Sequence, residues 1–249
     1  MKLLLSILLF PIALIRLLLM IFVSFLFVII VFIEDSIHRI TQKKYSYFSL
    51  HLWGYIMLLI LGIIVKRNKK LPSGTYIIMP NHRSYIDIFL MAAYAPASFV
   101  AKAELQKWPF IGQAIKAAKI ITVQRKELRS LLATMNKIRT HIENNLSVLV
   151  FPEGTTGTGP GVKPFKSGTF KIASEIKASI IPCAIAYKNP KLAWVDDDTF
   201  TRHFFREMWC PVSKAFVCFG TALFSTDYSE LESKTKESIQ DMLRSIEKN

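Results

Sequence analysis

An almost unbroken apolar segment, residues 3–33, constrains the fold of this chain more than any other feature. Apart from two serines, only Pro11 and Arg16 interrupt it. About 20 apolar residues suffice for a helix to cross the hydrocarbon core of a bilayer. A guanidinium group at mid-bilayer is costly unless it reaches an interface, so we expect Arg16 at a membrane boundary, a break near residues 11–16 and a membrane helix over 17–33. A cleaved signal peptide is disfavoured, since the run is too long and no small-residue cleavage site follows it.

A second apolar stretch, residues 45–65, has lysines or arginines on both flanks. Equal flanking charge assigns no direction of crossing. Two interpretations stay open. The stretch is either a second membrane-embedded helix, joined to the first through a polar turn over 34–44, or a buried helix of the globular part. We therefore expect membrane-associated helices in 1–70 and one α/β domain in 71–249.

The charge of the chain indicates an anionic partner. Thirty-two Lys and Arg residues against eighteen Asp and Glu leave a formal net charge of +14, which is typical of proteins that meet nucleic acid or a membrane surface. Membrane lipid is favoured over nucleic acid, because the basic residues lie beside apolar spans instead of among exposed aromatic residues. The three cysteines show neither CxxC nor framework spacing and are interpreted as reduced thiols. The five histidines lack ligand spacing, so no metal is expected.

Beyond residue 70, short apolar runs alternate with stretches of helical periodicity. The predicted strands are residues 76–79, 98–101, 120–123, 147–151, 180–186 and 216–219. The predicted helices are residues 86–94, 111–118, 126–144, 168–176 and 229–247. This order predicts an α/β fold with a mostly parallel central sheet flanked by helices, preceded by the membrane-embedded helical segment.

The stretch from Asn81 to Asp87 contains a candidate general base. Histidine is the side chain whose unperturbed pKa lies nearest neutrality, so His82 is suited to take a proton from a hydroxyl group. The spacing allows the Asp87 carboxylate to reach a ring nitrogen of His82, fix its tautomer and stabilise the imidazolium. The acceptor's own hydroxyl would then attack an acyl carbonyl, without a serine or cysteine nucleophile. Taken alone, the spacing is common, and an ordinary loop histidine is then the default interpretation.

The position of the pair and a second polar loop strengthen the hypothesis. His82 follows a predicted strand, and ligands of α/β folds bind at the carboxyl ends of strands. Residues 151–157 (Phe-Pro-Glu-Gly-Thr-Thr-Gly) follow another predicted strand in the same way, so the two loops are expected to meet across one cleft. The glycines there allow the backbone to approach an anionic or polar ligand.

These residues resemble the glycerophospholipid acyltransferases, which include the 1-acylglycerol-3-phosphate acyltransferases. Asn81-His82-Arg83-Ser84-Tyr85-Ile86-Asp87 is similar to the family's His-x4-Asp signature. Three further blocks follow in the family's order: Lys102-Ala103-Glu104-Leu105 continuing to Arg125, Phe151-Pro152-Glu153-Gly154-Thr155, and Ile180-Ile181-Pro182-Cys183-Ala184. Four ordered blocks, spanning roughly residues 75–187, are much more specific than any one of them.

The resemblance implies a role for each matched residue. His82 would be the general base and Asp87 its orienting partner. Lys102 and Arg125 would be cationic contacts for a phosphate, with Glu153 and Gly154 shaping the acceptor loop. The full substrate-binding set that it implies is Asn81, Ser84, Lys102, Glu104, Arg125, Glu153, Gly154, Thr155, Thr156 and Lys166. Acyl-CoA or acyl-carrier protein would be the co-substrate, and no resident cofactor is expected.

One position departs from the family's pattern. Members that act on lysophosphatidate usually carry arginine where this chain has Thr156, and threonine cannot replace the bidentate grip of a guanidinium on phosphate. The sequence Gly154-Thr155-Thr156 in the third block resembles that of relatives that acylate other lysophospholipids or lyso-ornithine lipid. Lys163 or Lys166 would then supply the anion contact, unless both belong to a solvated basic face.

The leading hypothesis is a membrane-bound enzyme that acylates the free hydroxyl of a lysolipid, most simply 1-acylglycerol-3-phosphate giving phosphatidate. The second keeps this chemistry and changes the acceptor to lyso-ornithine lipid or another lysophospholipid. A third, from a different class, is a non-catalytic membrane protein that binds anionic lipid. We expect a bacterial inner membrane, with the catalytic domain on its cytoplasmic side. No feature predicts the oligomeric state.

Overall fold

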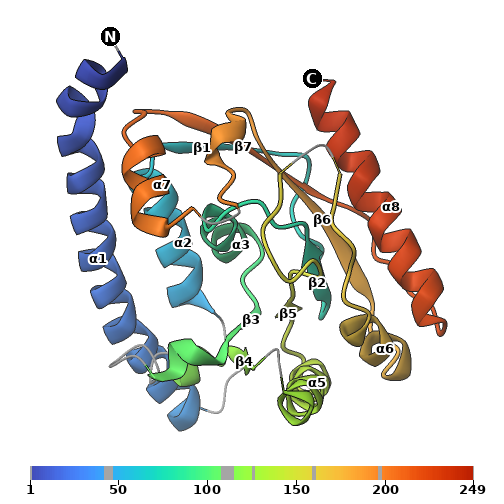
Figure 1. Cartoon of the computed structure of the whole chain (residues 1–249). Helices are drawn as coiled ribbons and strands as arrows, with labels where there is room; N and C mark the ends of the chain where they lie inside the picture. Colours follow the sequence, from blue (N-terminus) through green and yellow to red (C-terminus); the bar gives the residue numbers. More distant parts are fainter. Residues whose placement is uncertain are drawn as a thin grey trace.

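The computed structural model describes residues 2–41, 47–107, 115–124, 127–158, 161–195 and 198–248. Within these residues a seven-stranded sheet forms the centre, with the strand order β1-β7-β6-β2-β5-β3-β4 (Figure 1). The strands are β1 (Ile63–Arg67), β2 (Ile77–Pro80), β3 (Ser98–Lys102), β4 (Ile121–Val123), β5 (Val148–Leu149), β6 (Ile180–Tyr187) and β7 (Ser213–Phe219). All neighbouring strands are parallel except β6 and β7, so the expected mostly parallel sheet is confirmed.

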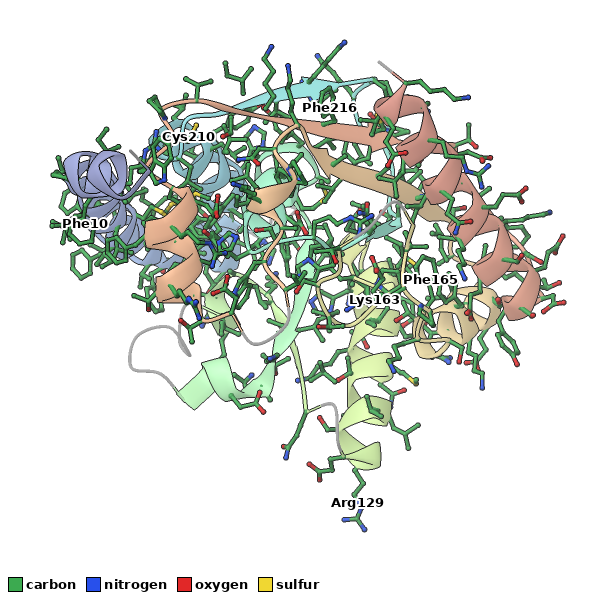
Figure 2. The ribbon with its side chains drawn as sticks, turned by 45° about the horizontal axis from the view of Figure 1, so that its top comes forward. Phe10, Arg129, Lys163, Phe165, Cys210 and Phe216 are labelled. Atoms are coloured by element: carbon green, nitrogen blue, oxygen red, sulfur yellow. The ribbon has the colours of Figure 1, made fainter. Side chains whose placement is uncertain are left out.

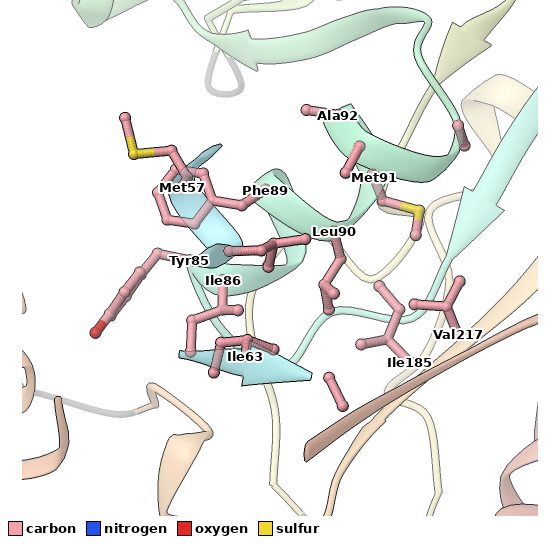
Figure 3. Packing of buried hydrophobic residues seen from close by; sticks show 14 of the residues in the cluster. Met57, Ile63, Tyr85, Ile86, Phe89, Leu90, Met91, Ala92, Ile185 and Val217 are labelled. Atoms are coloured by element: carbon pink, nitrogen blue, oxygen red, sulfur yellow. The ribbon is translucent and has the colours of Figure 1, made fainter. Parts of the chain in front are cut away.

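Helices cover both faces of the sheet (Figure 1). They are α1 (Lys2–Thr41), α2 (Phe48–Ile60), α3 (Ile86–Tyr94), α5 (Leu128–Glu143), α6 (Gly168–Glu175), α7 (Phe200–Glu207) and α8 (Tyr228–Glu247), with short 3-10 helices η1 (Ala103–Lys107) and η2 (Pro190–Leu192). Side chains alternate along a strand, so each strand feeds two cores. Ile78 packs into the cluster with α2, α3 and α7, whereas its neighbours Ile77 and Met79 pack with α5, α6 and α8. Figure 3 shows part of the first cluster, which includes Met57 of α2, Leu90 of α3 and Ile185 of β6.

The predicted break in the N-terminal helix is wrong. Helix α1 runs continuously from Lys2 to Thr41 with Pro11 inside it. Arg16 is buried and donates hydrogen bonds to the carbonyl oxygens of Met208 at 2.7 Å, Cys210 at 2.8 Å and Pro211 at 2.8 Å. These carbonyls follow the carboxyl end of α7, where backbone acceptors are left over by the helix. The charge is therefore satisfied by protein, which is why Arg16 does not need to reach a membrane boundary.

The part of α1 from Phe10 to Thr41 is long and apolar enough to cross a membrane. Only 17% of its most apolar window is buried inside the protein, so it is not a core helix of the globular part. Large apolar side chains such as Phe22 and Phe25 are about 60% exposed, at 59% and 62%. An apolar surface of this size needs a partner other than water.

The second apolar stretch divides into two elements. Helix α2 has 13 residues, fewer than the roughly 20 that span a bilayer, and β1 takes up the rest of the stretch. Gly54 lets α2 approach α3 closely, since a Cβ there would lie 2.5 Å from the Ala93 nitrogen. Helix α2 therefore packs on the globular part, but it is not wholly buried, since Phe48 is 60% and Leu59 is 76% exposed. The expected turn over 34–44 is wrong for residues 34–41, which continue α1, and residues 42–46 lie outside the described part.

Helices α1 and α2 still lie side by side. Glu34 of α1 accepts hydrogen bonds from the backbone nitrogens of Phe48 at 2.8 Å and Ser49 at 3.1 Å, which caps the start of α2. The rings of Phe27 and Trp53 stack at 5.2 Å. The sheet itself begins at Ile63, ahead of the 71–249 range expected for the α/β domain.

The substitution Arg16→Leu is expected to destabilise the chain. It leaves three carbonyl oxygens without their charged donor, and a lost bond to a charged group together with a stranded buried acceptor costs about 2 kcal/mol or more. Chemical denaturation in detergent measures this loss. Arg129→Leu, at an exposed position of α5, serves as the control and should change the free energy of unfolding by less than about 0.5 kcal/mol. Equal stability of the two variants would contradict the anchoring role of Arg16.

Candidate active site

His82 and Asp87 are in direct contact. The loop between β2 and α3 carries His82, and Asp87 lies in the first turn of α3. The His82 Nδ1 atom is 2.8 Å from Asp87 Oδ2, and the same oxygen accepts hydrogen bonds from the backbone nitrogens of Arg83 at 2.5 Å and Ser84 at 2.9 Å. The Asp87 side chain is fully buried, whereas that of His82 is 17% exposed. The carboxylate is therefore fixed from several sides, and the imidazole is fixed by the carboxylate.

The second oxygen of Asp87 has its own donor. The hydroxyl of Tyr187, the last residue of β6, donates a hydrogen bond to Asp87 Oδ1. Burial and the neighbouring carboxylate raise the pKa of the Tyr187 phenol well above its usual value, so the hydroxyl stays protonated and donates. Each oxygen of the Asp87 carboxylate thus accepts at least one hydrogen bond, which fixes the orientation of the carboxylate.

The two polar loops predicted to meet do so. Strands β2 and β5 are neighbours in the sheet, so the loops that follow them lie next to each other. Glu153 is buried and bridges them: its Oε1 accepts from the His82 backbone nitrogen at 2.7 Å, and its Oε2 accepts from the Lys163 backbone nitrogen at 2.8 Å. The ring of Phe151 stacks on the imidazole of His82, with 4.0 Å between their centroids. The position of His82 is therefore set from both loops.

Burial raises the pKa of the Glu153 carboxyl, and the hydrogen bonds from Lys163 and His82 oppose this rise. Both of its oxygens accept from N–H groups, so a glutamine at this position can satisfy only one of the two. We expect Glu153→Gln to lower the free energy of unfolding by about 1–3 kcal/mol, the cost of a stranded buried polar group. Denaturant titration in detergent checks this, with Glu175→Gln as the exposed control. An unchanged midpoint for Glu153→Gln would show that the bridge is dispensable.

Arg83 closes the loop beyond Glu153. Its guanidinium is nearly buried and donates to the carbonyl oxygens of Gly157 at 3.1 Å and Gly161 at 2.7 Å. The backbone nitrogen of Gly157 in turn donates to the His82 carbonyl at 2.9 Å. The residue next to the histidine thus holds the glycine-containing loop against it. In the sequence, Arg83 occupies one of the four unspecified positions of the His-x4-Asp motif, so its role in holding this loop was not predicted.

Other predicted site residues lie in the walls of the site. Asn81 is fully buried, and its amide exchanges hydrogen bonds of 3.0 and 2.7 Å with the backbone of Ile185, so it ties β2 to β6. Ser84 is buried, and its hydroxyl has no hydrogen-bond partner among the described residues. Gly154 has a left-handed φ of 69°, and a Cβ there would touch the Lys166 side chain at 3.8 Å. Thr155 is exposed.

The cationic residues that the resemblance implied as phosphate contacts are not gathered around the histidine loop in the described part of the chain. Lys102 ends β3 and Glu104 belongs to η1; both are exposed, and the strand order places β5 between them and the histidine loop. Arg125 lies outside the described residues. The Lys163 ammonium donates to the carbonyl oxygen of Thr156 at 2.7 Å, which brings a positive charge to the position where the family usually has arginine. Figure 2 shows Lys163 near the middle of the molecule.

The described residues contain no group of three or more His, Cys, Asp or Glu side chains arranged to hold a metal ion.

Comparisons with known proteins agree with this arrangement. The protein-family model described as "Acyltransferase" matches residues 62–186, half of the chain, and covers both polar loops. The chain is 28% identical over 195 residues to a 1-acyl-sn-glycerol-3-phosphate acyltransferase of Neisseria gonorrhoeae, which covers 75% of this chain and 76% of the relative. It is 28% identical over 144 residues to a lyso-ornithine lipid O-acyltransferase of Pseudomonas aeruginosa, covering 56% of this chain and 55% of the relative.

A solved structure has the same fold. The 1-acyl-sn-glycerophosphate (LPA) acyltransferase PlsC from Thermotoga maritima superposes with a TM-score of 0.72 at 19% sequence identity, over 100% of this chain and 99% of that one. The likeness therefore includes the N-terminal helices as well as the sheet.

Proposed function

Since the chain belongs to the acyltransferase family and is an O-acyltransferase, we propose that it moves a fatty acyl group from a thioester to the free hydroxyl of lysophosphatidate, giving phosphatidate. The observation that carries this proposal is the 2.8 Å contact between His82 Nδ1 and Asp87 Oδ2 at the carboxyl end of β2. Relatives with this activity in their names support the acceptor. The donor is acyl-CoA or acyl-carrier protein, and the protein itself holds no resident cofactor.

The proposed mechanism uses His82 as general base. Because Nδ1 faces Asp87, the other ring nitrogen, Nε2, is the atom that takes the proton from the lysolipid hydroxyl. The hydroxyl oxygen attacks the thioester carbonyl and forms a tetrahedral intermediate. When this intermediate collapses, the C–S bond breaks and the imidazolium returns its proton to the leaving thiolate. Asp87 stabilises the imidazolium between these two steps.

The acceptor's phosphate needs a cation, and Lys163 is a candidate. Its ammonium lies against the Thr156 carbonyl, so it supplies charge beside the residue that replaces the family's usual arginine. Lys166, whose side chain passes Gly154, is the second candidate on the same loop. Lys102, Glu104 and Arg125 keep the substrate-binding roles that the resemblance implies for them, as proposals.

A second acceptor class is supported by Thr156 itself. A single ammonium is a weaker phosphate ligand than a bidentate guanidinium, and a named lyso-ornithine lipid O-acyltransferase is among the relatives. The exposed apolar surface of α1 supports membrane association, and we propose the cytoplasmic side of a bacterial inner membrane.

A lysolipid panel tests the proposal. Purified protein in detergent is given one labelled acyl-CoA and, separately, lysophosphatidate, other lysophospholipids and lyso-ornithine lipid. The highest kcat/KM is expected for lysophosphatidate. A higher kcat/KM for lyso-ornithine lipid would make that lipid the acceptor, with the acyl-transfer chemistry unchanged. Binding of anionic vesicles without transfer to any acceptor would reject the enzymatic proposal in favour of a lipid-binding membrane protein.

A further inference from the structure

A cavity of about 870 Å³ opens beside strands β1, β7 and β6, next to the carboxyl end of α8. Its floor is a row of register partners across the three strands: Lys66 pairs with Phe216, and Phe216 pairs with Ala186. Leu243 and Ile246 of α8 contribute an apolar wall. Figure 2 shows Phe216 close to this end of the helix. The cavity thus offers apolar surface on two sides.

Cations dominate the rest of its lining. Lys66, Lys188, Lys214 and Arg83 line the cavity, against the single carboxylate of Glu247. The backbone nitrogen of Lys188, which directly follows β6, donates to the carbonyl oxygen of Lys214 in β7 at 2.9 Å, so the two lysines lie opposite each other. Like charges in that arrangement repel each other. Among the described residues, none of the three lysines forms a salt bridge. An anion in the cavity would relieve the repulsion.

The cavity adjoins the catalytic pair. Two of its lining residues, Arg83 and Tyr187, also belong to the candidate active site: Arg83 follows His82, and the Tyr187 hydroxyl bonds to Asp87. A ligand in the cavity would therefore lie against two residues that position the base or its loop. Lysine clusters with adjoining apolar surface suit a phosphate ester that carries an apolar or extended chain.

We infer that this cavity binds the phosphate of one of the two substrates, the lysolipid acceptor or the acyl-CoA donor. The inference rests on the proposed function, and it assigns phosphate binding to Lys66, Lys188 and Lys214, which lie outside the Thr156 loop, although Thr158 of that loop also lines the cavity. The two sources share the same chemistry, a phosphate ester, and differ in which substrate loses affinity when the lysines are removed.

The test is a double variant, Lys188→Ala with Lys214→Ala. KM is measured for lysophosphatidate at saturating acyl-CoA and for acyl-CoA at saturating lysophosphatidate. We expect KM for one of them to rise about tenfold, equivalent to about 1.4 kcal/mol, with little change in kcat. A rise for lysophosphatidate assigns the cavity to the acceptor, and a rise for acyl-CoA assigns it to the donor. The double arginine variant should keep the wild-type KM, because it keeps the charge.

A matched control removes two lysines elsewhere: Lys70→Ala with Lys137→Ala loses the same charge outside the cavity, at exposed positions. If both KM values of the cavity variant stay within about twofold of this control, the inference is overturned. Failure of the proposed function has a different signature, namely no acyl transfer by the wild-type chain. In that event, equal equilibrium binding of lysophosphatidate and of acyl-CoA by the wild type and the cavity variant overturns the inference as well.

Discussion

Replacing His82 by alanine is expected to lower kcat by about 10²–10⁴-fold, the usual contribution of a general base. The imidazole contacts the fully buried Asp87 carboxylate and is itself 17% exposed, so it can reach both the carboxylate and a substrate. Its backbone nitrogen, which contacts Glu153, is retained in the variant, so the loop should keep its shape. Acyl transfer from labelled acyl-CoA to lysophosphatidate measures the change.

The matched control is His141→Ala, which removes an imidazole from α5 that bonds only to backbone carbonyls, those of Lys137 and Lys119. It should keep kcat within about threefold of wild type, since it touches no group of the site. Circular dichroism of both variants verifies the fold. A His82→Ala variant that is folded and as active as the control would remove the proposed base.

Replacing Asp87 by asparagine is expected to lower kcat by about 10²–10⁴-fold while leaving the fold intact. An amide oxygen in the place of Oδ2 can still accept from Arg83, Ser84 and His82, and the amide nitrogen can donate to the Tyr187 hydroxyl oxygen. The hydrogen bonds survive, but the negative charge that stabilises the imidazolium is lost. The effect therefore falls on the chemical step and not on lysolipid binding.

Separate measurement of kcat and KM distinguishes an effect on the chemical step from an effect on lysolipid binding. We expect KM for lysophosphatidate to change by less than about threefold, because Asp87 is fully buried and touches no substrate. Asp241→Asn, an exposed carboxylate of α8, is the control. A folded Asp87→Asn variant with wild-type kcat would mean that the carboxylate has only a structural role.

The central sheet was largely predictable because each strand is a short apolar run bounded by polar residues. Every predicted strand occurs, although β5 is reduced to Val148–Leu149 and β7 starts earlier, at Ser213. Predicted helices match α3, α5, α6 and α8 closely. The first four residues of the predicted helix 111–118 lie outside the described part, whereas residues 115–117 are helical.

Strand β1 was hidden because it continues an apolar run that reads as one membrane helix. The left-handed turn at Gly62, with φ 67°, separates α2 from β1 and was the available signal. Helix α7 was missed because it spans only eight residues, although Phe200, His203 and Phe204 recur at helical spacing and were the available signal. Arg16 could not be interpreted correctly from sequence, since its three acceptors lie more than 190 residues further along the chain.

For the site, the contact between His82 and Asp87 followed from their spacing, and the meeting of the two loops followed from parallel strands ending at one edge. Two further contacts were not predicted: the hydrogen bond from Tyr187 to the Asp87 carboxylate, and those from Arg83 to the loop that contains Gly157 and Gly161. Tyr187 directly follows the predicted strand 180–186, at the same edge as His82, so the rule that places ligands at strand carboxyl ends could have identified it.

The most direct test of direct attack by the lysolipid hydroxyl is a rapid-mixing measurement of thiol release from acyl-CoA, with and without lysophosphatidate. Thiol should appear only when the lysolipid is present, in equal amount to phosphatidate, and His82→Ala should slow the appearance of both by about 10²–10⁴-fold. Stoichiometric thiol release and an acylated protein in the absence of any lysolipid would contradict the account.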